Sequence, residues 1–290
     1  MTPAGNPAQP AAAQPLPAGR RRRRHWSMAR TAHVLLSANA LWMYLFLYVP
    51  IALLVIFSFN NATHSLSVWQ GFTFSWYEQL FRDAAVGQAL RNSLVVALVS
   101  TVLSTMIGTL AALAMERYRF PGKMTFDALL YLPIIIPEIA MGVMLLLFFV
   151  LMGMDLGLPT IIISHVAFNI SFVTVVVRAR LAGLSTTLEE AAQDLGANGW
   201  QTFRRITLPL LMPGIFAGAL LAFTISLDDY VITYFTAGPG ATTLPIRIYG
   251  MVKKGISPDV NALSTLMLLA AMVLVVLSLV LQRGGDRKPT

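Results

Sequence analysis

The chain of 290 residues is strongly apolar: 56% of its residues are hydrophobic and 12% are charged, against roughly 25% charged residues in an average soluble domain. This composition excludes a water-soluble globular protein. The absence of cysteine excludes disulfide scaffolds, cysteine-based metal sites and thiol catalysis. The net charge of +8 does not indicate nucleic-acid binding, because five arginines form one terminal run, Arg20 to Arg24, instead of covering a folded face.

The N-terminal segment, residues 1–33, is rich in proline, alanine and glutamine and then in arginine. Such a composition cannot bury a core, so we expect a disordered basic tail, with the arginine run held against anionic lipid. A basic segment before an apolar stretch is also typical of a cleavable signal peptide. The apolar stretch that follows is too long for one and has no A-x-A cleavage site, which favours the lipid anchor.

Six stretches are long enough to cross the hydrocarbon core of a membrane, which takes about 20 apolar residues. Lipid offers the backbone no hydrogen-bonding partner, and these stretches do not alternate in polarity, so helices are predicted. The stretches are 34–59, 92–115, 128–154, 156–177, 208–235 and 260–282. The sequence therefore predicts an all-α membrane protein with a six-helix domain over residues 34–282 and a short tail over 283–290.

The basic residues predict the orientation of these helices. If the chain starts inside the cell, sixteen of the 21 lysines and arginines lie inside and five lie outside. Because cytoplasmic loops carry an excess of lysine and arginine, both termini are predicted to be cytoplasmic. The loop over residues 181–209 is then also cytoplasmic.

This loop has the pattern of a helical hairpin. A first helix is predicted with a cap at Thr186 or Thr187 and with Glu189 and Glu190 in its first turn, where the helix dipole favours negative charge. Gly196 is expected to break the helix, because glycine reaches the left-handed conformation at little cost. A second short helix is predicted over residues 198–206, ending at Pro209. One apolar stripe on the first helix contains Leu184, Leu188, Ala191, Ala192 and Leu195.

The spacing of the residues in the loop resembles the EAA loop of the membrane subunits of bacterial ATP-binding-cassette importers. The matching positions are Glu190, Ala191, Ala192, Gly196, Ile206, Leu208 and Pro209. In that family the hairpin is the coupling element that docks into a cleft of a cytoplasmic ATPase. The resemblance implies a type I importer permease (MetI-like) architecture. The alternative is an ordinary amphipathic loop that packs on its own protein.

The resemblance extends over nearly all of the chain after residue 34 and is greatest to the permeases of spermidine/putrescine importers. The segments that carry it are 226–235, 238–240, 244–249 and 257–262. It implies polyamine transport across the bacterial inner membrane, with a second permease, two ATPase subunits and a periplasmic substrate-binding protein as partners. It implies no cofactor in this chain, since ATP belongs to the ATPase subunits. Sulfate, iron and other type I importers share parts of the pattern.

Carboxylates inside predicted spans are costly, about 2.5–3.5 kcal/mol each on insertion scales, and mark candidate functional sites. Glu138 lies ten residues into the third span, which places it roughly 15 Å deep in a straight helix. The flanking Pro133 and Pro137 predict a bend there and a helix that lines a cavity.

Two further carboxylates, Asp228 and Asp229, lie in the fifth span. Neighbours in a helix differ in direction by about 100 degrees, so we expect one to face the translocation path and the other to bind a helix, a backbone donor or the outer gate. Tyr230 and Tyr234, one turn apart, could offer aromatic faces to ammonium groups. The alternatives are hydrogen bonds between helices that fix the packing, and a proton relay.

Other chemistry is not indicated. His165 is expected to be a hydrogen-bonded core residue, and no second histidine or cysteine has metal-ligand spacing. Gly122-Lys123 does not form a P-loop, because Arg117 occupies the place of the first glycine and Met124 that of the serine or threonine. The chain is therefore expected to be a transport subunit without ATPase activity. A permease for another solute and an ion-driven secondary transporter are the remaining alternatives.

Overall fold

The computed structural model describes residues 22–62, 68–255 and 257–285, and the side chains of residues 22–29 and 277–285 are not part of that description. Most of the predicted basic tail, residues 1–21, and the end of the C-terminal tail, residues 286–290, lie outside the described residues. The described residues are helical apart from loops and one isolated bridge between Asn60 and Phe72. The all-α prediction is thus confirmed for this part of the chain.

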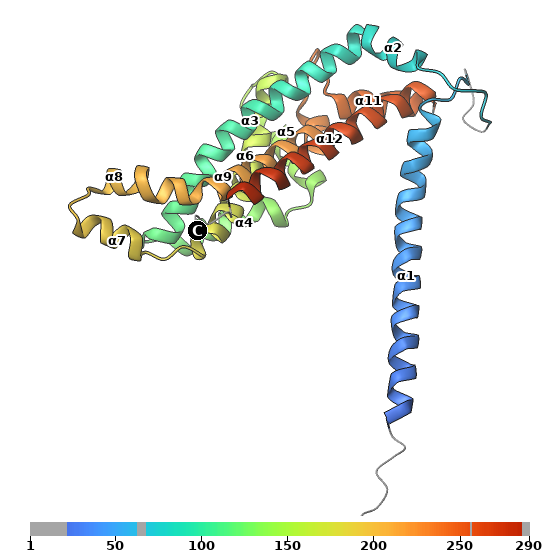
Figure 1. The fold of residues 1–290 in the computed structure, drawn as a ribbon. Coiled ribbons are helices and arrows are strands. Elements are labelled where there is room, and N and C mark those ends of the chain that lie inside the picture. The colour runs from blue at the N-terminus through green and yellow to red at the C-terminus, as the bar shows by residue number, and fades with distance from the viewer. Residues whose placement is uncertain (1–21, 63–67, 256, 286–290) are drawn as a thin grey trace, which may run out of the picture. The chain divides into compact units, whose positions relative to one another are not determined.

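The helices follow one another in a simple order (Figure 1). They are α1 (Arg22–Phe57), α2 (Ser75–Arg82), α3 (Ala84–Arg117), α4 (Lys123–Ile135), α5 (Glu138–Leu151), α6 (Leu158–Ala182), α7 (Thr187–Asp194), α8 (Gly199–Thr202), the π-helical turn η1 (Phe203–Thr207), α9 (Leu208–Asp228), α10 (Val231–Thr236), α11 (Leu244–Lys254) and α12 (Pro258–Gly285).

Five helical stretches of the described residues are long and apolar enough to cross a membrane, and α4 with α5 makes a sixth if the bent pair is one span. The bend between them is 110°. Ile136 is extended at the break, with ψ of 133°, because a following proline disfavours the helical conformation. The predicted bend is present, but it is sharp enough to separate the predicted span 128–154 into two helices.

The chain divides into two compact units, residues 1–53 and 54–290. The first unit holds most of α1, which begins at Arg22 and contains Pro50. Residues 22–33, predicted as tail, therefore continue the helix. All the remaining elements belong to the second unit.

The centre of the second unit is a bundle of α3, α6 and α9, which pack pairwise. Their shared core contains Val173, Val177 and Leu211. Gly214 and Gly218 of α9 lie in close contact with α6: a Cβ added at Gly214 would lie 2.7 Å from the Cβ of Arg180, and one at Gly218 would lie 3.4 Å from Val173. Small residues thus let α9 approach α6 closely.

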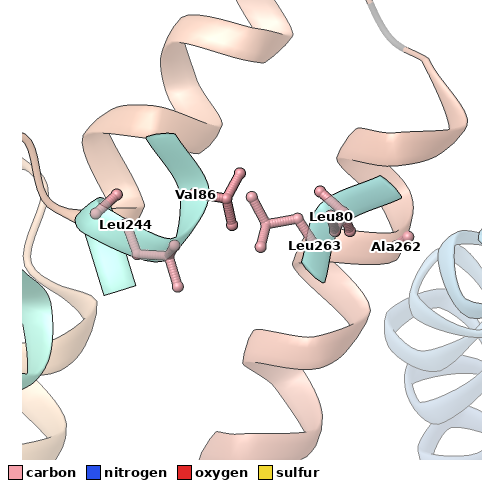
Figure 2. Packing of buried hydrophobic residues seen from close by; sticks show 6 residues of the cluster. Leu80, Val86, Leu244, Ala262 and Leu263 are labelled. Atoms are coloured by element: carbon pink, nitrogen blue, oxygen red, sulfur yellow. The ribbon is translucent and has the colours of Figure 1, made fainter. Parts of the chain in front are cut away.

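The two ends of this bundle carry different elements. Figure 1 shows α7 and α8 at one end, with α2 and α11 at the other, and α12 running back from α11 toward the α7–α8 end. At the α2–α11 end a second core joins Leu80, Val86, Leu244 and Leu263 from four helices, and Figure 2 shows these side chains gathered between the ribbons. At the opposite end, Arg178 of α6 pairs with carboxylates of α3 and α4.

Candidate functional site

The predicted fifth span is interrupted at its pair of aspartates, so the expectation of one helix from residue 208 to 235 is wrong. α9 ends at Asp228, Asp229 is extended with ψ of 123°, and α10 begins at Val231. The Asp229 carboxylate accepts a hydrogen bond from the backbone N–H of Thr233 at 2.7 Å. A side chain that satisfies the first donors of a helix favours a helix start over a continuous helix, which explains the interruption.

Asp229 is also the centre of a buried polar network. Its carboxylate accepts the Thr233 hydroxyl at 2.7 Å and lies 3.3 Å from His165 Nε2 of α6. His165 is 1% exposed, and its Nδ1 lies 2.6 Å from Ser226 Oγ, which is 3.0 Å from Ser100 Oγ of α3. The network ties α3, α6, α9 and α10 together, and the expectation that His165 is a hydrogen-bonded core residue is confirmed.

Asp228, the preceding residue, has a different environment. It is exposed, and no hydrogen bond or ion pair is made by its carboxylate among the described residues. It lines a cavity of about 350 Å³ between α9, α11 and α12. Apart from Asp228, this cavity is lined mainly by apolar side chains such as Ile248, Met267 and Leu268. A lone carboxylate in an apolar cavity is suited to bind a cation with a methylene chain.

Three tyrosines lie next to this carboxylate in the chain or on the adjoining helix. The rings of Tyr230 and Tyr234 are 5.5 Å apart, as expected for residues one turn apart. Tyr249 of α11 stacks on Tyr230 with ring centroids 4.6 Å apart. Sequence reasoning gave Tyr249 no role, because the contact joins residues of two helices separated by a loop. The likeness of segment 244–249 to the polyamine permeases was the signal that could have found it.

Glu138 is placed apart from this group. It is the first residue of α5, is exposed, and has no hydrogen bond or ion pair within the described part of the chain. Its helix packs on α10 through Met141 and Ile232. No interaction in the structure joins Glu138 to Asp228 or to the tyrosines. The depth of roughly 15 Å expected for it assumed a straight helix, and the 110° bend removes that assumption.

The α7–α8 hairpin has the predicted helix–break–helix form at its start. Glu189 and Glu190 lie in the first turn of α7, and Gly196 follows with a φ of +89°, a left-handed conformation that strains any residue with a Cβ. Neither Thr186 nor Thr187 caps α7 through its side chain. Ser185 serves instead, since its hydroxyl accepts the Thr187 N–H at 3.2 Å.

The second part of the hairpin differs from expectation. Asn198 caps α8 by accepting the Gln201 N–H at 2.9 Å, but Pro209 does not end the helix. The chain continues from α8 through η1 into α9, and Pro209 lies in the first turn of α9. A proline is tolerated where the helical register changes, because its missing N–H and its ring are accommodated there. The second helix of the hairpin is thus continuous with α9, from Gly199 to Asp228.

The hairpin is braced against α3 by Glu189, the first of its two consecutive glutamates. Glu189 Oε1 accepts Arg117 Nη2 at 2.9 Å and the Thr207 hydroxyl at 2.9 Å. Sequence reasoning missed this contact because Arg117 and Glu189 are far apart in the chain. Glu190 is exposed and takes part in no ion pair that the described residues form. Glu189 thus holds the hairpin to α3, whereas the Glu190 carboxylate is exposed and unpaired among the described residues.

The hairpin exposes several large apolar side chains. Leu188 is 55% exposed, Leu195 is 90% exposed and Trp200 is 67% exposed. Of the predicted stripe, Leu184 packs on the bundle core. The EAA positions Glu190, Ala191, Gly196 and Pro209 are exposed, and Ala192, Ile206 and Leu208 are half-buried. Leu188 and Leu195 of the stripe are therefore exposed, whereas the alternative of an ordinary amphipathic loop would pack them on their own chain. Large exposed apolar residues of this kind mark an interaction surface.

Metal chemistry finds no support in the described residues, where no three histidine, cysteine or carboxylate side chains are grouped to hold an ion.

Comparisons with known proteins give a consistent picture. A family model described as "Binding-protein-dependent transport system inner membrane component" matches residues 104–288. The chain is 42% identical over 248 residues to the spermidine/putrescine transport system permease protein PotC of Escherichia coli (strain K12), covering 86% of this chain and 94% of that protein. It is 43% identical over 230 residues to the putrescine transport system permease protein PotI of the same strain, covering 77% of this chain and 82% of that one.

Solved structures show the same fold. The chain aligns with a bacterial alginate ABC transporter, in complex with an alginate pentasaccharide-bound periplasmic protein, with a TM-score of 0.71 at 20% identity. That alignment covers 93% of this chain and 100% of the other. The MetNI methionine ABC transporter in an inward-facing conformation aligns with a TM-score of 0.54 at 23% identity, covering 74% and 97%. At these identities the likeness is one of fold.

Proposed function

Because the chain belongs to the family of binding-protein-dependent transport system inner membrane components, we propose that it is the permease subunit of an ATP-driven importer of polyamines. The observation that carries this proposal is the 42% identity to a spermidine/putrescine permease across 94% of that protein's length. The chain is a multi-pass inner membrane protein of the importer-permease fold.

The hairpin is assigned the coupling role. Its exposed leucines and tryptophan and its small alanines offer a surface into which a partner can fit closely, and Glu190 supplies a charge for register at the rim. The partners in this proposal are two ATPase subunits, which bind and hydrolyse ATP, a second permease and a periplasmic substrate-binding protein. The chain itself carries no cofactor. Movement of the hairpin reaches the transport path directly, because α8, η1 and α9 are continuous.

The cavity at the end of α9 is assigned to the substrate. A polyamine carries ammonium groups joined by methylene chains, and each ammonium needs a carboxylate or an aromatic face in place of water. Asp228 offers the carboxylate and the apolar lining suits the methylenes. The stacked Tyr230 and Tyr249, from the segment after Asp228 and from α11, offer aromatic faces. Asp229 is assigned a structural role, because its carboxylate oxygens already contact Thr233 and His165. Glu138 remains a candidate for a separate point on the path.

Orientation follows from the same assignment. The proposed docking to an ATPase requires a cytoplasmic hairpin, and α12 runs back toward the hairpin end of the bundle (Figure 1), which supports a cytoplasmic C-terminus. The α2–α11 end then faces the periplasm. The excess of basic residues in the hairpin loop and at the C-terminus agrees with this orientation.

The proposal is tested by uptake into proteoliposomes that contain the whole importer with its loaded binding protein and internal ATP. Radiolabelled spermidine or putrescine should accumulate only when ATP is present. Asp228→Asn should lower the rate at least about tenfold, since a charge-assisted contact contributes roughly 1.5–3 kcal/mol, while the complex stays assembled. Uptake of 2-aminoethylphosphonate in place of polyamines, or uptake driven by an ion gradient without ATP, would contradict the proposal.

A further inference from the structure

Lys253 lies over Tyr249 of α11, the helix that also contributes Ile248 to the substrate cavity. Its Nζ is 4.9 Å from the centroid of the Tyr249 ring, within the distance of about 6 Å at which an ammonium is attracted to an aromatic face. No carboxylate forms an ion pair with Lys253 anywhere in the described residues. Lys253 is itself exposed. Among the described residues, the face of the Tyr249 ring is therefore the group that attracts the Lys253 ammonium.

The same ring belongs to the tyrosine group assigned to the substrate. Tyr249 stacks on Tyr230, and Ile248, the residue before it, lines the cavity together with Asp228. A primary ammonium on a flexible methylene chain is the chemical group that a polyamine carries at each end. The lysine side chain thus has the same terminal group as the proposed substrate and rests on an aromatic face that stacks on Tyr230, two residues after the proposed substrate carboxylate.

We propose that Lys253 is a tethered competitor of the substrate, whose ammonium occupies the aromatic subsite on Tyr249 until a polyamine ammonium displaces it. This inference rests on the proposed function and adds a specificity-determining residue to it. The interaction is weak enough to be displaced, because cation–π contacts at exposed sites change an equilibrium by about two- to fivefold. A single ammonium gains little at the subsite, whereas a polyamine can displace Lys253 while its next ammonium is held at Asp228.

A local role for Lys253 is the competing explanation. Lys253 and Lys254 both lie in the last turn of α11, where positive charge is favoured by the helix dipole. Lys254 has the same charge and helical position but lines a different cavity, with Asp83 and Arg247. Lys254→Met is therefore a matched control, since it removes the same charge from the same turn without uncovering the Tyr249 ring.

The experiment measures equilibrium binding of radiolabelled spermidine to the purified complex of permeases and ATPases in nanodiscs, without the binding protein. Lys253→Met should lower the dissociation constant about two- to fivefold. Lys253→Arg, which keeps a cation over the ring, should bind as the unmodified complex does. Lys254→Met should also leave the constant unchanged. The inference would be overturned if Lys253→Met and the unmodified complex bound spermidine equally, or if neither bound it measurably. It would also be overturned if Lys254→Met lowered the dissociation constant as much as Lys253→Met.

A second variant series ties the gain to the ring. Tyr249→Phe keeps the aromatic face and should keep the gain from Lys253→Met, whereas Tyr249→Leu should weaken spermidine binding and abolish that gain. A persistent gain in the Tyr249→Leu background would show that the lysine acts by long-range charge and would refute the subsite. ATP-dependent uptake by the unmodified importer is measured in parallel. If that uptake fails, the proposed function is wrong, and if only the binding pattern fails, the role of Lys253 alone is wrong.

Discussion

The α9–α10 break and the α7–α8 hairpin each contain two consecutive carboxylates, of which one is held and one is free. At the break, Asp229 is held by α10 and His165 while Asp228 faces a cavity. At the hairpin, Glu189 is held by Arg117 while Glu190 is exposed. The difference is burial: the Asp229 side chain is 7% exposed, whereas that of Glu189 is 20% exposed. A held carboxylate should therefore matter more for stability at the break than at the hairpin.

The largest effect is expected from Asp229→Ala. The change leaves the Thr233 N–H and hydroxyl without their acceptor and removes the carboxylate beside His165 Nε2 in a buried site, at a total cost of roughly 3 kcal/mol. Thermal unfolding of the purified complex should show a clearly lower midpoint. Asp228→Ala is the matched control, because it removes the neighbouring carboxylate, which has no partner to lose. Equal midpoints for the two variants would remove the distinction between the held and the free aspartate.

Sequence reasoning located the apolar helices well and the interruptions poorly. Hydropathy is a local property, so the positions of α3, α6 and α12 followed from it. Pro137 also predicted the bend, because a proline ring disfavours the helical conformation of the residue before it whatever the surroundings. The break at Asp229 was missed since the surrounding residues stay apolar to Phe235. The signal was Asp229 itself, since aspartate is among the residues preferred at the start of a helix, where its carboxylate accepts a backbone N–H.

For the candidate sites, sequence reasoning identified residues that are close in the chain but not contacts between distant helices. The EAA spacing identified the hairpin because its residues are close in the chain. It could not reveal the Arg117–Glu189 ion pair or the stacking of Tyr249 on Tyr230, which depend on how distant helices pack. The error at Pro209 had another cause. Proline was taken to end a helix, although it is tolerated in a first helical turn, where Pro209 lies.

The next effect concerns the shape of the hairpin. Gly196→Ala forces a residue with a Cβ into a φ of +89°, at a cost of about 1–2 kcal/mol. We expect binding of the ATPase subunits to weaken about tenfold, measured by titrating the purified ATPase against the reconstituted permeases. Gly199→Ala is the control: no heavy atom lies within 4 Å of the added Cβ at either position, but only Gly196 has positive φ. Equal affinity in the two variants would show that the left-handed turn is unimportant for docking.

A smaller effect is expected from substitutions of Glu189 and Glu190, which should differ in how they change ATPase binding and transport. Glu190→Gln removes the exposed charge, so ATPase binding should weaken about two- to fivefold and become less sensitive to salt. Glu189→Gln disturbs the brace to Arg117, so it should lower the solute moved per ATP hydrolysed and leave the salt dependence as it was. Binding as a function of ionic strength, together with transport and ATPase rates, distinguishes the two. Identical profiles for both variants would mean that the brace has no separate role.

The smallest effect is expected at the far end of the bundle, where Asp83 accepts Arg247 Nη2 at 3.1 Å. Partial burial acts to raise the pKa of Asp83, but hydrogen bonds from the Ala85 N–H and the Arg247 guanidinium outweigh it and hold the pKa below its usual value. The folded pKa is thus lower than the unfolded one, so the stabilisation is present above a pH of about 4 and is lost as the pH falls through the folded pKa.

Each side chain of the Asp83–Arg247 pair is about one-third exposed. We therefore expect the pair to contribute less than about 1 kcal/mol to the free energy of unfolding. Asp83→Asn should lower the unfolding midpoint slightly at neutral pH, and the difference from the unmodified chain should shrink as the pH is lowered below about 4. Thermal unfolding across that pH range checks this. A difference that grows on acidification would have the wrong sign for a carboxylate whose pKa is depressed by folding, and would show that Arg247 does not hold Asp83 in the folded protein.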